Sequence, residues 1–174
     1  GALSPAITLS SVAKGATGVI MSVTLTPATA VAPDGKIIIT LSGAGLALSG
    51  AGTLAFTAPS TTSPAGTAAL SGSGPFVLTI SLTVGTFTGG QPITFTIPGF
   101  TNPTNVQVAI TNVAAATTAN DGTTIVGASI IGTYSAILEG TSLGSSQPAI
   151  TLSSVAKGAT AVTMSVTLTP ATAV

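Results

Sequence analysis

The sequence predicts an all-β protein, an antiparallel β-sandwich of about eight to ten strands with two pseudo-symmetric halves. Three observations predict this class. Apolar and hydroxyl side chains alternate along most of the chain, and no segment shows a convincing helical period. Strict alternation places one set of side chains on a buried face and the other set outside. A long stretch near the start also recurs near the end, which indicates one unit of a tandem array.

The recurring stretch occupies residues 5–31 and again residues 148–174, an offset of 143 residues. A sequence that begins again after a fixed interval is most simply one period of a longer array. We therefore expect residues 5–147 to form one full repeat. Residues 148–174 then begin the next repeat or, alternatively, complete the preceding sheet by strand addition.

Only two positions differ between the copies: Gly18 is replaced by Ala161, and Ile20 by Thr163. Both share the parity of Thr24, which we assign to the outward face. The inward residues are unchanged, with Val19, Met21, Val23 and Leu25 recurring as Val162, Met164, Val166 and Leu168. Altering a core residue changes packing, whereas altering a surface residue usually does not. The two differences therefore agree with the assigned faces.

The alternating segments define the expected strands. These span residues 6–11, 18–26, 36–42, 52–57, 66–71, 76–83, 91–97, 105–112 and 122–131, with a weaker strand at 133–138. Within 105–112, Val106, Val108 and Ile110 share one parity. The Ala-rich run Ala114–Ala116 is too short to predict a helix. Turn residues lie between the strands, including Pro33-Asp34-Gly35, Asn102-Pro103 and Asn120-Asp121-Gly122.

A fainter repeat lies inside the long one. Residues Val23–Gly43 resemble Ile80–Gly99, and Thr53–Leu70 loosely match Val106–Val126. Two such halves placed face to face would form a sandwich. Residues 71–75 between them are only of loop length, which favours one domain over two.

Composition excludes most chemistry. Charged residues make up 3% of the chain, against about a quarter in ordinary domains. There is no Arg, His, Cys or Trp. Three lysines cannot form a basic stripe for nucleic acid. Zinc, haem and iron–sulfur sites need His or Cys, and a Ser/His or Cys/His nucleophile has no base. We expect no enzyme activity, no cofactor, and no catalytic or metal-binding residue.

Mean hydropathy is +0.76, yet Thr, Ser, Gly and Pro interrupt every apolar run before the ~18–20 residues that a spanning helix needs. We expect no transmembrane segment. Alternating strands also build outer-membrane barrels, but these carry aromatic girdles. One Tyr, five Phe and no Trp argue against that class.

The few charged residues suggest two sites, each with a simpler interpretation. Asp34 and Asp121 could bind calcium, but each precedes Gly in a turn, and calcium loops need several carboxylates close together. Lys14 or Lys36 with Glu139 and a nearby Asn could form an intramolecular isopeptide crosslink; a solvated lysine is the simpler interpretation.

Two backbone patterns also have simpler interpretations. Thr-x-Thr steps suggest an ice-binding face, but the short period of such proteins is absent from this sequence. The run Gly43-Ala44-Gly45 suggests a phosphate loop, but it lacks the following Lys and the helix that such a loop needs.

The outward positions are mostly Thr and Ser, whereas natural sheets protect their edges with charge. A formal net charge of zero favours association. We therefore expect neighbouring copies or sugars to cover this surface. The Asn102-Pro103-Thr104 triplet is blocked by its proline, so any glycan is O-linked. The candidate acceptors are Ser60, Thr61, Thr62 and Ser63.

This repeat pattern, with its charge-poor and Thr-, Ser-, Gly- and Ala-rich composition, resembles the tandem Ig-like β-sandwich repeats of extracellular fibre, adhesin-stalk and surface-layer proteins. The resemblance implies an extracellular or cell-surface location and assembly with copies of the same chain. It predicts a non-enzymatic structural repeat of a filament or surface fibre. The alternative is a repeated adhesive or carbohydrate-binding module. The assembly candidates are Ile150, Leu152, Val162, Met164, Val166 and Leu168.

Overall fold

The computed structural model describes residues 3–41, 45–50, 52–58, 64–139, 149–153 and 162–167. The chain divides into two compact units, residues 1–139 and residues 140–174. Strands make up 57% of the structure, and the described residues include no helix. The prediction of an all-β protein is therefore confirmed.

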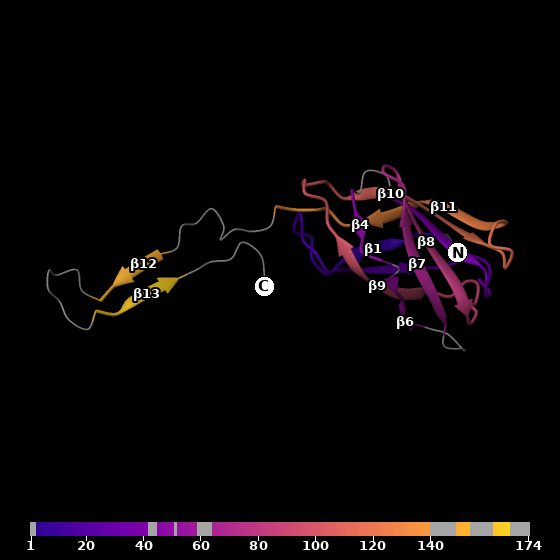
Figure 1. The fold of residues 1–174 in the computed structure, drawn as a ribbon, viewed down its shortest axis with the longest axis horizontal. Helices are drawn as coiled ribbons and strands as arrows, with labels where there is room; N and C mark the ends of the chain where they lie inside the picture. The colour runs from indigo at the N-terminus through magenta and orange to yellow at the C-terminus, as the bar shows by residue number, and fades with distance from the viewer. Residues whose placement is uncertain are drawn as a thin grey trace. The chain divides into compact units, whose positions relative to one another are not determined.

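The described residues of the first unit form eleven strands (Figure 1). They are β1 (Ala6–Leu9), β2 (Val19–Leu25), β3 (Lys36–Leu41), β4 (Ala47–Leu48), β5 (Gly52–Thr53), β6 (Ala55–Ala58), β7 (Ala65–Ser71), β8 (Phe76–Val84), β9 (Ile93–Thr101), β10 (Ile110–Thr118) and β11 (Ile125–Tyr134). The second unit contains β12 (Ala149–Leu152) and β13 (Met164–Thr167), which form a separate two-stranded sheet.

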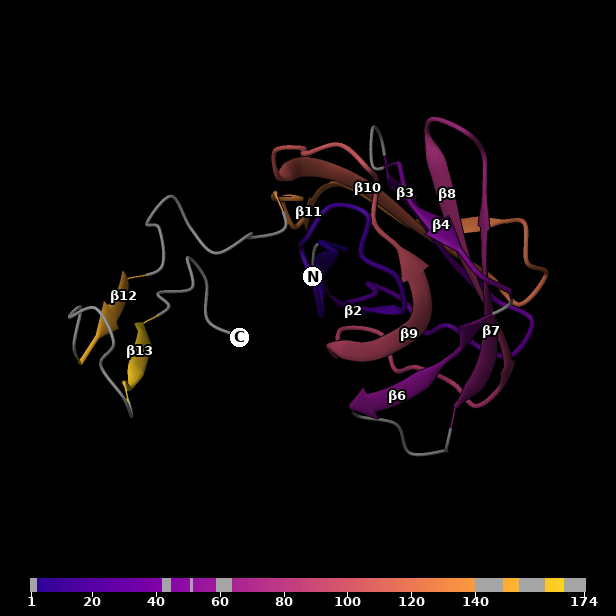
Figure 2. The same cartoon turned by 60° about the vertical axis from the view of Figure 1, so that its left-hand side comes forward.

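The eleven strands form one sheet in the order β4-β9-β2-β1-β11-β10-β3-β8-β7-β5, with β6 also paired to β9. The sheet curls until it is nearly closed into a barrel (Figure 2). Its two ends approach each other, since β5 contacts β9 and β4 contacts β7. The core of the unit lies inside this curled sheet.

The sheet is mixed, which corrects the prediction of a purely antiparallel one. Strand β1 pairs with β2 antiparallel but with β11 parallel, where Ala6 lies opposite Thr133 and Ile7 opposite Tyr134. A hairpin turn forces its two strands to run antiparallel. Strands β1 and β11 are far apart in sequence, so no turn constrains their direction.

The two predicted halves do not appear as facing layers. In the faint repeat, β2 corresponds to β8, and β3 corresponds to β9. In the structure β2 pairs with β9, and β3 pairs with β8. The two segments meet where Val31 and Phe87 exchange backbone hydrogen bonds of 3.1 and 2.9 Å. Each of these strand pairs therefore takes one strand from each of the two segments.

The alternating pattern places the core residues as predicted for this unit. Val23 and Leu25 are buried, whereas Thr24 between them is exposed. The residues predicted to face inward are also buried in β3, β8 and β9: Ile37, Ile39, Leu41, Leu78, Ile80, Leu82, Ile93, Phe95 and Ile97. Because successive side chains of a strand point to opposite faces, the local pattern alone fixes this result.

The strand predicted at 105–112 is displaced. Strand β10 begins at Ile110 and continues through the Ala-rich run to Thr118. Val106 and Val108 lie outside it and expose 52% and 84% of their surface. Residues 114–117 pair with β3 on one side, and β10 pairs with β11 on the other, so tertiary pairing overrides the low strand propensity of Ala. The weak strand at 133–138 is the end of β11, followed by isolated bridges at Ile137 and Leu138.

Candidate assembly site

The second copy of the repeated sequence forms the same hairpin as the first. Leu9 lies opposite Met21 in the β1–β2 pair, and Leu152 lies opposite Met164 in the β12–β13 pair. All four residue pairs of one register recur in the other, shifted by the repeat offset. We call β1–β2 the N-terminal hairpin and β12–β13 the C-terminal hairpin. Identical sequence therefore gives identical local pairing in both units.

Side-chain hydrogen bonds at the far end of the pairing are repeated as well. The Ser10 amide donates to the Ile20 carbonyl, and the Ile20 amide donates to Ser10 Oγ, both at 2.9 Å. Ser153 and Thr163 exchange the same two bonds, again at 2.9 Å. The Ile20-to-Thr163 difference leaves these bonds intact because the position contributes only its backbone.

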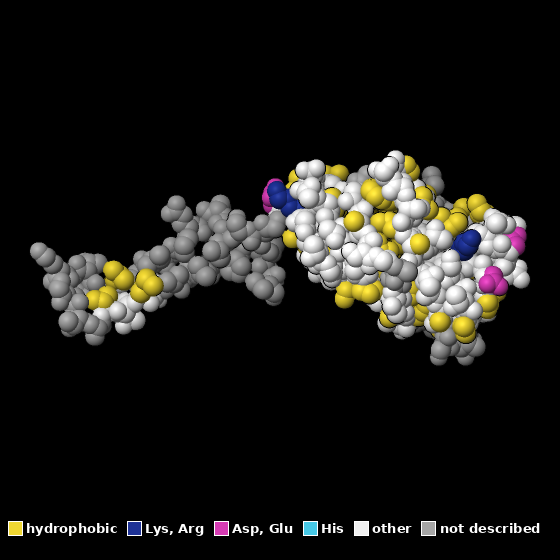
Figure 3. Space-filling model, viewed as in Figure 1, with side chains coloured by type: hydrophobic (Ala, Val, Ile, Leu, Met, Phe, Trp, Pro, Cys, Tyr) yellow, Lys and Arg dark blue, Asp and Glu magenta, His cyan; other side chains and the backbone are white. Residues whose placement is uncertain are grey.

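The two hairpins differ in what covers them. Met21 is fully buried, whereas Met164 exposes 62% of its surface. Val19 is 1% exposed, and its counterpart Val162 is 38% exposed. Leu152 is 49% exposed. Figure 3 shows hydrophobic side chains on the surface of the second unit. The described apolar side chains of the C-terminal hairpin therefore lack the cover that their counterparts have in the first unit. An isolated two-stranded hairpin is only marginally stable in water.

These exposed side chains include half of the predicted assembly residues. Leu152, Val162 and Met164 lie on the C-terminal hairpin or beside it. Ile150 and Val166 lie in β12 and β13, but their side chains are outside the described set. Leu168 and the predicted O-glycosylation residues Ser60, Thr61, Thr62 and Ser63 lie outside the described residues altogether.

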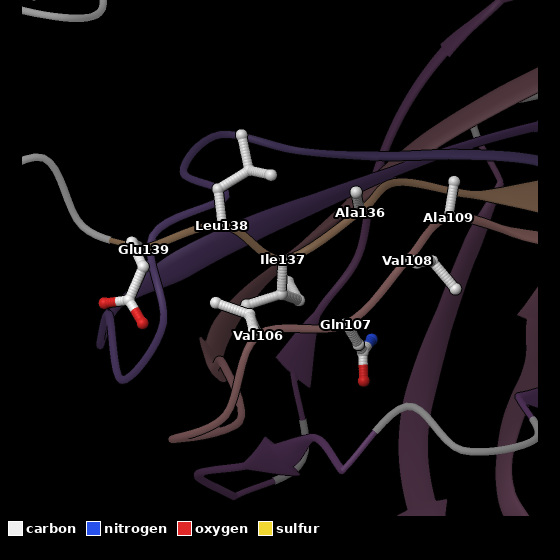
Figure 4. A pocket seen from close by; sticks show the side chains of 8 residues that line it. All are labelled: Val106, Gln107, Val108, Ala109, Ala136, Ile137, Leu138 and Glu139. Atoms are coloured by element: carbon white, nitrogen blue, oxygen red, sulfur yellow. The ribbon is translucent and has the colours of Figure 1, made fainter.

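The first unit carries an apolar groove that sequence reasoning missed. It has a volume of about 450 Å³ and is lined by Val106, Gln107, Val108, Ala109, Ala136, Ile137, Leu138 and Glu139 (Figure 4). Gln107 and Ile137 tie its two walls together through reciprocal backbone hydrogen bonds of 3.0 and 2.9 Å. The alternating valines that line it were interpreted as a strand, so the groove had no separate signal in the sequence.

An ion pair lies at one end of this groove. Lys14 Nζ is 2.9 Å from Oε1 and 2.8 Å from Oε2 of Glu139. The Lys14 amide also donates to the Leu138 carbonyl at 2.8 Å. The structure thus brings together the pair that we considered for an isopeptide crosslink. Both side chains are substantially exposed, and a nucleophilic lysine needs a desolvated setting. We therefore interpret the contact as a solvated ion pair.

The two Asp-Gly turns lie side by side, since the space above Gly122 is bounded by the Asp34 carbonyl and the Lys36 side chain. The carboxylate of Asp121 is used within its own turn. Hydrogen bonds from the Thr124 hydroxyl and then from the Thr123 and Thr124 amides lower the pKa of Asp121 to about 2. The turn interpretation of Asp121 is therefore confirmed.

Comparisons with family models, with curated proteins and with solved structures find no match to this chain. Among the described residues, no helix has the length and apolar character needed to cross a membrane. The structure defines the class of the protein as all-β, with a mixed sheet nearly closed into a barrel.

Proposed function

We propose that this chain is a non-enzymatic structural repeat of an extracellular filament or surface fibre, which assembles with copies of itself through strand and sheet packing. One observation carries the proposal. The same hairpin occurs twice with one register, and the apolar side chains described in the second copy, which we call the bare hairpin, are far more exposed than the buried Val19 and Met21 of the first. A hairpin whose first copy is buried in a core, and whose second copy exposes the same apolar side chains, offers a surface on which another repeat could pack.

The size of the effect supports assembly. Full removal of a Val, Leu or Met side chain from water stabilises a packed state by about 1.5–3 kcal/mol. Leu152, Val162 and Met164 are each already partly covered, so each offers a fraction of that amount. Covering all three together stabilises an assembled state by a few kcal/mol, which is sufficient to favour association when chains are held close together.

The outer surface of the first unit supports close packing of repeats. Only six residues of the chain are charged, and uncharged side chains dominate the face in Figure 3. On β2 and β9 the outward hydroxyls of Thr24 and Thr94 hydrogen-bond to each other at 2.9 Å. Repulsion between like charges therefore opposes lateral contact very little. O-linked sugars on residues 60–63 are the alternative cover, and both fit an extracellular or cell-surface location.

The adhesive or carbohydrate-binding alternative has less support. Sugar-binding surfaces commonly offer an exposed aromatic ring. Phe87, Phe95, Phe100 and Tyr134 are buried, and the other two aromatic residues, Phe56 and Phe76, pack against the core. The structure thus uses all six aromatic side chains for packing, and we propose no second function.

Electron microscopy tests the proposal. A chain of several repeats should form regular fibres under negative stain, and light scattering should give masses of many chains. Replacing Leu152 and Met164 together by Thr should reduce association, because it removes apolar area from the C-terminal hairpin. The matched control replaces Thr163 by Ser, an exposed change that leaves that area intact. A multi-repeat chain that stays monomeric at high concentration would contradict the proposal.

A further inference from the structure

We propose that the C-terminal hairpin binds the first unit of a second copy of this chain, where it replaces that copy's N-terminal hairpin between β9 and β11. We call the facing edges of β9 and β11 the acceptor site. This inference rests on the proposed function, since it names the partner and the interface through which repeats would join.

The N-terminal hairpin is the element that connects the two edges of the acceptor site. Strand β2 pairs with β9 from Val19 opposite Phe100 to Leu25 opposite Ile93. Strand β1 pairs with β11, and the Thr133 amide donates to the Pro5 carbonyl at 2.7 Å. Removing this hairpin would leave two unpaired strand edges and a row of uncovered core residues. Such edges accept another strand of matching pattern.

The C-terminal hairpin matches this site residue for residue. The paired and inward-facing residues of the N-terminal hairpin recur unchanged in the C-terminal one. The register between the two strands is also the same. Every backbone hydrogen bond and core contact that Met21 and its neighbours make is therefore available to Met164 and its neighbours.

The two sequence differences determine which of the two hairpins binds the acceptor site more tightly. Gly18 has a φ of 66°, a left-handed conformation that Ala161 would adopt only with strain. Ile20 is 43% exposed, so Thr163 fits the same position without loss. We expect the N-terminal hairpin to be preferred roughly fivefold at the acceptor site. Exchange leaves the number of bare hairpins unchanged and replaces a contact within one chain by a contact between two chains, so the exchanged state is a minor one whose population rises with protein concentration.

A second copy is favoured over the chain's own acceptor site by the connection that each requires. In its own site, β12 would lie beside β11 and parallel to it. Adjacent parallel strands need a crossover connection of a dozen or more residues. Ile137 is held by its bridge to Gln107, which lies outside the N-terminal hairpin, so only residues 138–148 are left to make that crossover. Binding to a second copy requires no such connection.

Disulfide trapping tests the exchange, because the chain has no cysteine of its own. Thr24 and Thr94 touch across β2 and β9, and Thr167 is the counterpart of Thr24. The full chain carrying Thr94→Cys and Thr167→Cys should give covalent dimers and larger species after refolding and oxidation. Their fraction should rise with protein concentration. The chain carrying Thr94→Cys and Thr24→Cys should close within one copy.

A matched control measures chance collisions. Thr163 is the counterpart of Ile20, four residues from the trapping position, so a cysteine there would lie about 13 Å from the cysteine introduced at position 94 in the exchanged state. The chain carrying Thr94→Cys and Thr163→Cys should therefore give few dimers. Equal dimer yields from both pairs would overturn the proposal. A crosslink formed only within single chains would do so as well.

A second measurement weakens the natural occupant. Met21→Asp buries a carboxylate in the N-terminal hairpin, and exchange would move it into water. This variant should keep its β-sheet circular dichroism and sediment as a dimer or larger species. Adding Met164→Asp should remove both properties, whereas Met164→Asp alone should keep the β-sheet circular dichroism and sediment as a monomer. If Met21→Asp by itself unfolds as completely as the double variant, the exchange does not occur.

These results are separable from those for the proposed function. Fibres from a multi-repeat chain together with a failed trap would overturn the exchange and leave the structural role in place. A successful trap without fibres would support the exchange and contradict the filament.

Discussion

Two adjacent threonines in β10 show how one residue type serves opposite roles. Thr117 and Thr118 are both buried. Thr118 Oγ1 accepts a hydrogen bond from the Lys36 amide at 2.9 Å and donates to the Ala119 carbonyl at 3.1 Å. Thr117 Oγ1 has no partner among the described residues. One hydroxyl therefore holds β3 and β10 together, while the other only adds a desolvation cost.

Replacing each of these threonines by valine should change stability in opposite directions. Thr117→Val removes an unpaired buried hydroxyl and should raise the free energy of unfolding by about 1 kcal/mol. Thr118→Val leaves the Lys36 amide without its hydrogen-bond acceptor and should lower that free energy by about 1–3 kcal/mol. Urea denaturation of both variants measures the difference. Equal losses from the two changes would contradict the assigned roles.

The turn at Asp121 should make stability fall in acid. Its folded-state pKa of about 2 lies below the ordinary value of 3.8, so protonation favours the unfolded chain. The stabilisation is fully present above about pH 4 and is lost as the pH falls toward 2. Carboxyl NMR titration of the folded protein should give a pKa near 2 for this residue. A midpoint near 4 would contradict the turn geometry.

At the scale of elements, the parallel contact between β1 and β11 depends on a glycine. A side-chain carbon at Gly132 would lie 2.7 Å from the Pro5 carbonyl oxygen and would overlap the Pro5 ring. Gly132 is buried beside the first residues of β1, so neither backbone has room to move away. The absence of a side chain therefore allows the parallel pairing.

Gly132→Ala should lower the free energy of unfolding by about 1–3 kcal/mol, because it forces β1 and β11 apart. Gly127→Ala is the matched control in the same strand. The added carbon there would approach only the Thr117 hydroxyl, at 3.0 Å, and a side chain can turn away. Thermal or urea unfolding of the two variants gives the comparison. A control as costly as the test variant would argue against the specific contact with Pro5.

Element boundaries show where sequence reasoning stops. Alternation predicted β2, β3, β8 and β9 to within a few residues, because each has a clear inward parity. It failed for residues 105–118, where valines alternate outside the sheet and an Ala-rich run lies inside it. The local pattern predicts neither the exposed valines nor the paired Ala-rich run. Each depends on whether a neighbouring strand offers an edge to pair with.

At the scale of the molecule, the first unit has its own core. All the buried core residues among those described lie between Leu3 and Ile137, within residues 1–139. The described part of the second unit exposes its apolar residues. The core that the structure describes therefore belongs to the first unit.

A chain that ends after Glu139 should fold on its own. Its free energy of unfolding should lie within about 0.5 kcal/mol of the value for the full chain in dilute solution, because none of these core residues is removed. Far-UV circular dichroism and urea denaturation at micromolar concentration check this. A large loss of stability would show that residues 140–174 contribute to the fold of the first unit.

The amino-acid sequence by itself determined the strand class and the inward face of each clearly alternating strand, since both follow from local geometry. Met21 faces inward because its neighbours along the strand alternate. Only the tertiary structure decided the parallel closure between β1 and β11, the pairing of β2 with β9, and the contrast between buried Met21 and exposed Met164. The two methionines lie in nearly identical sequence, and burial differs because it depends on the strands that pack against a residue.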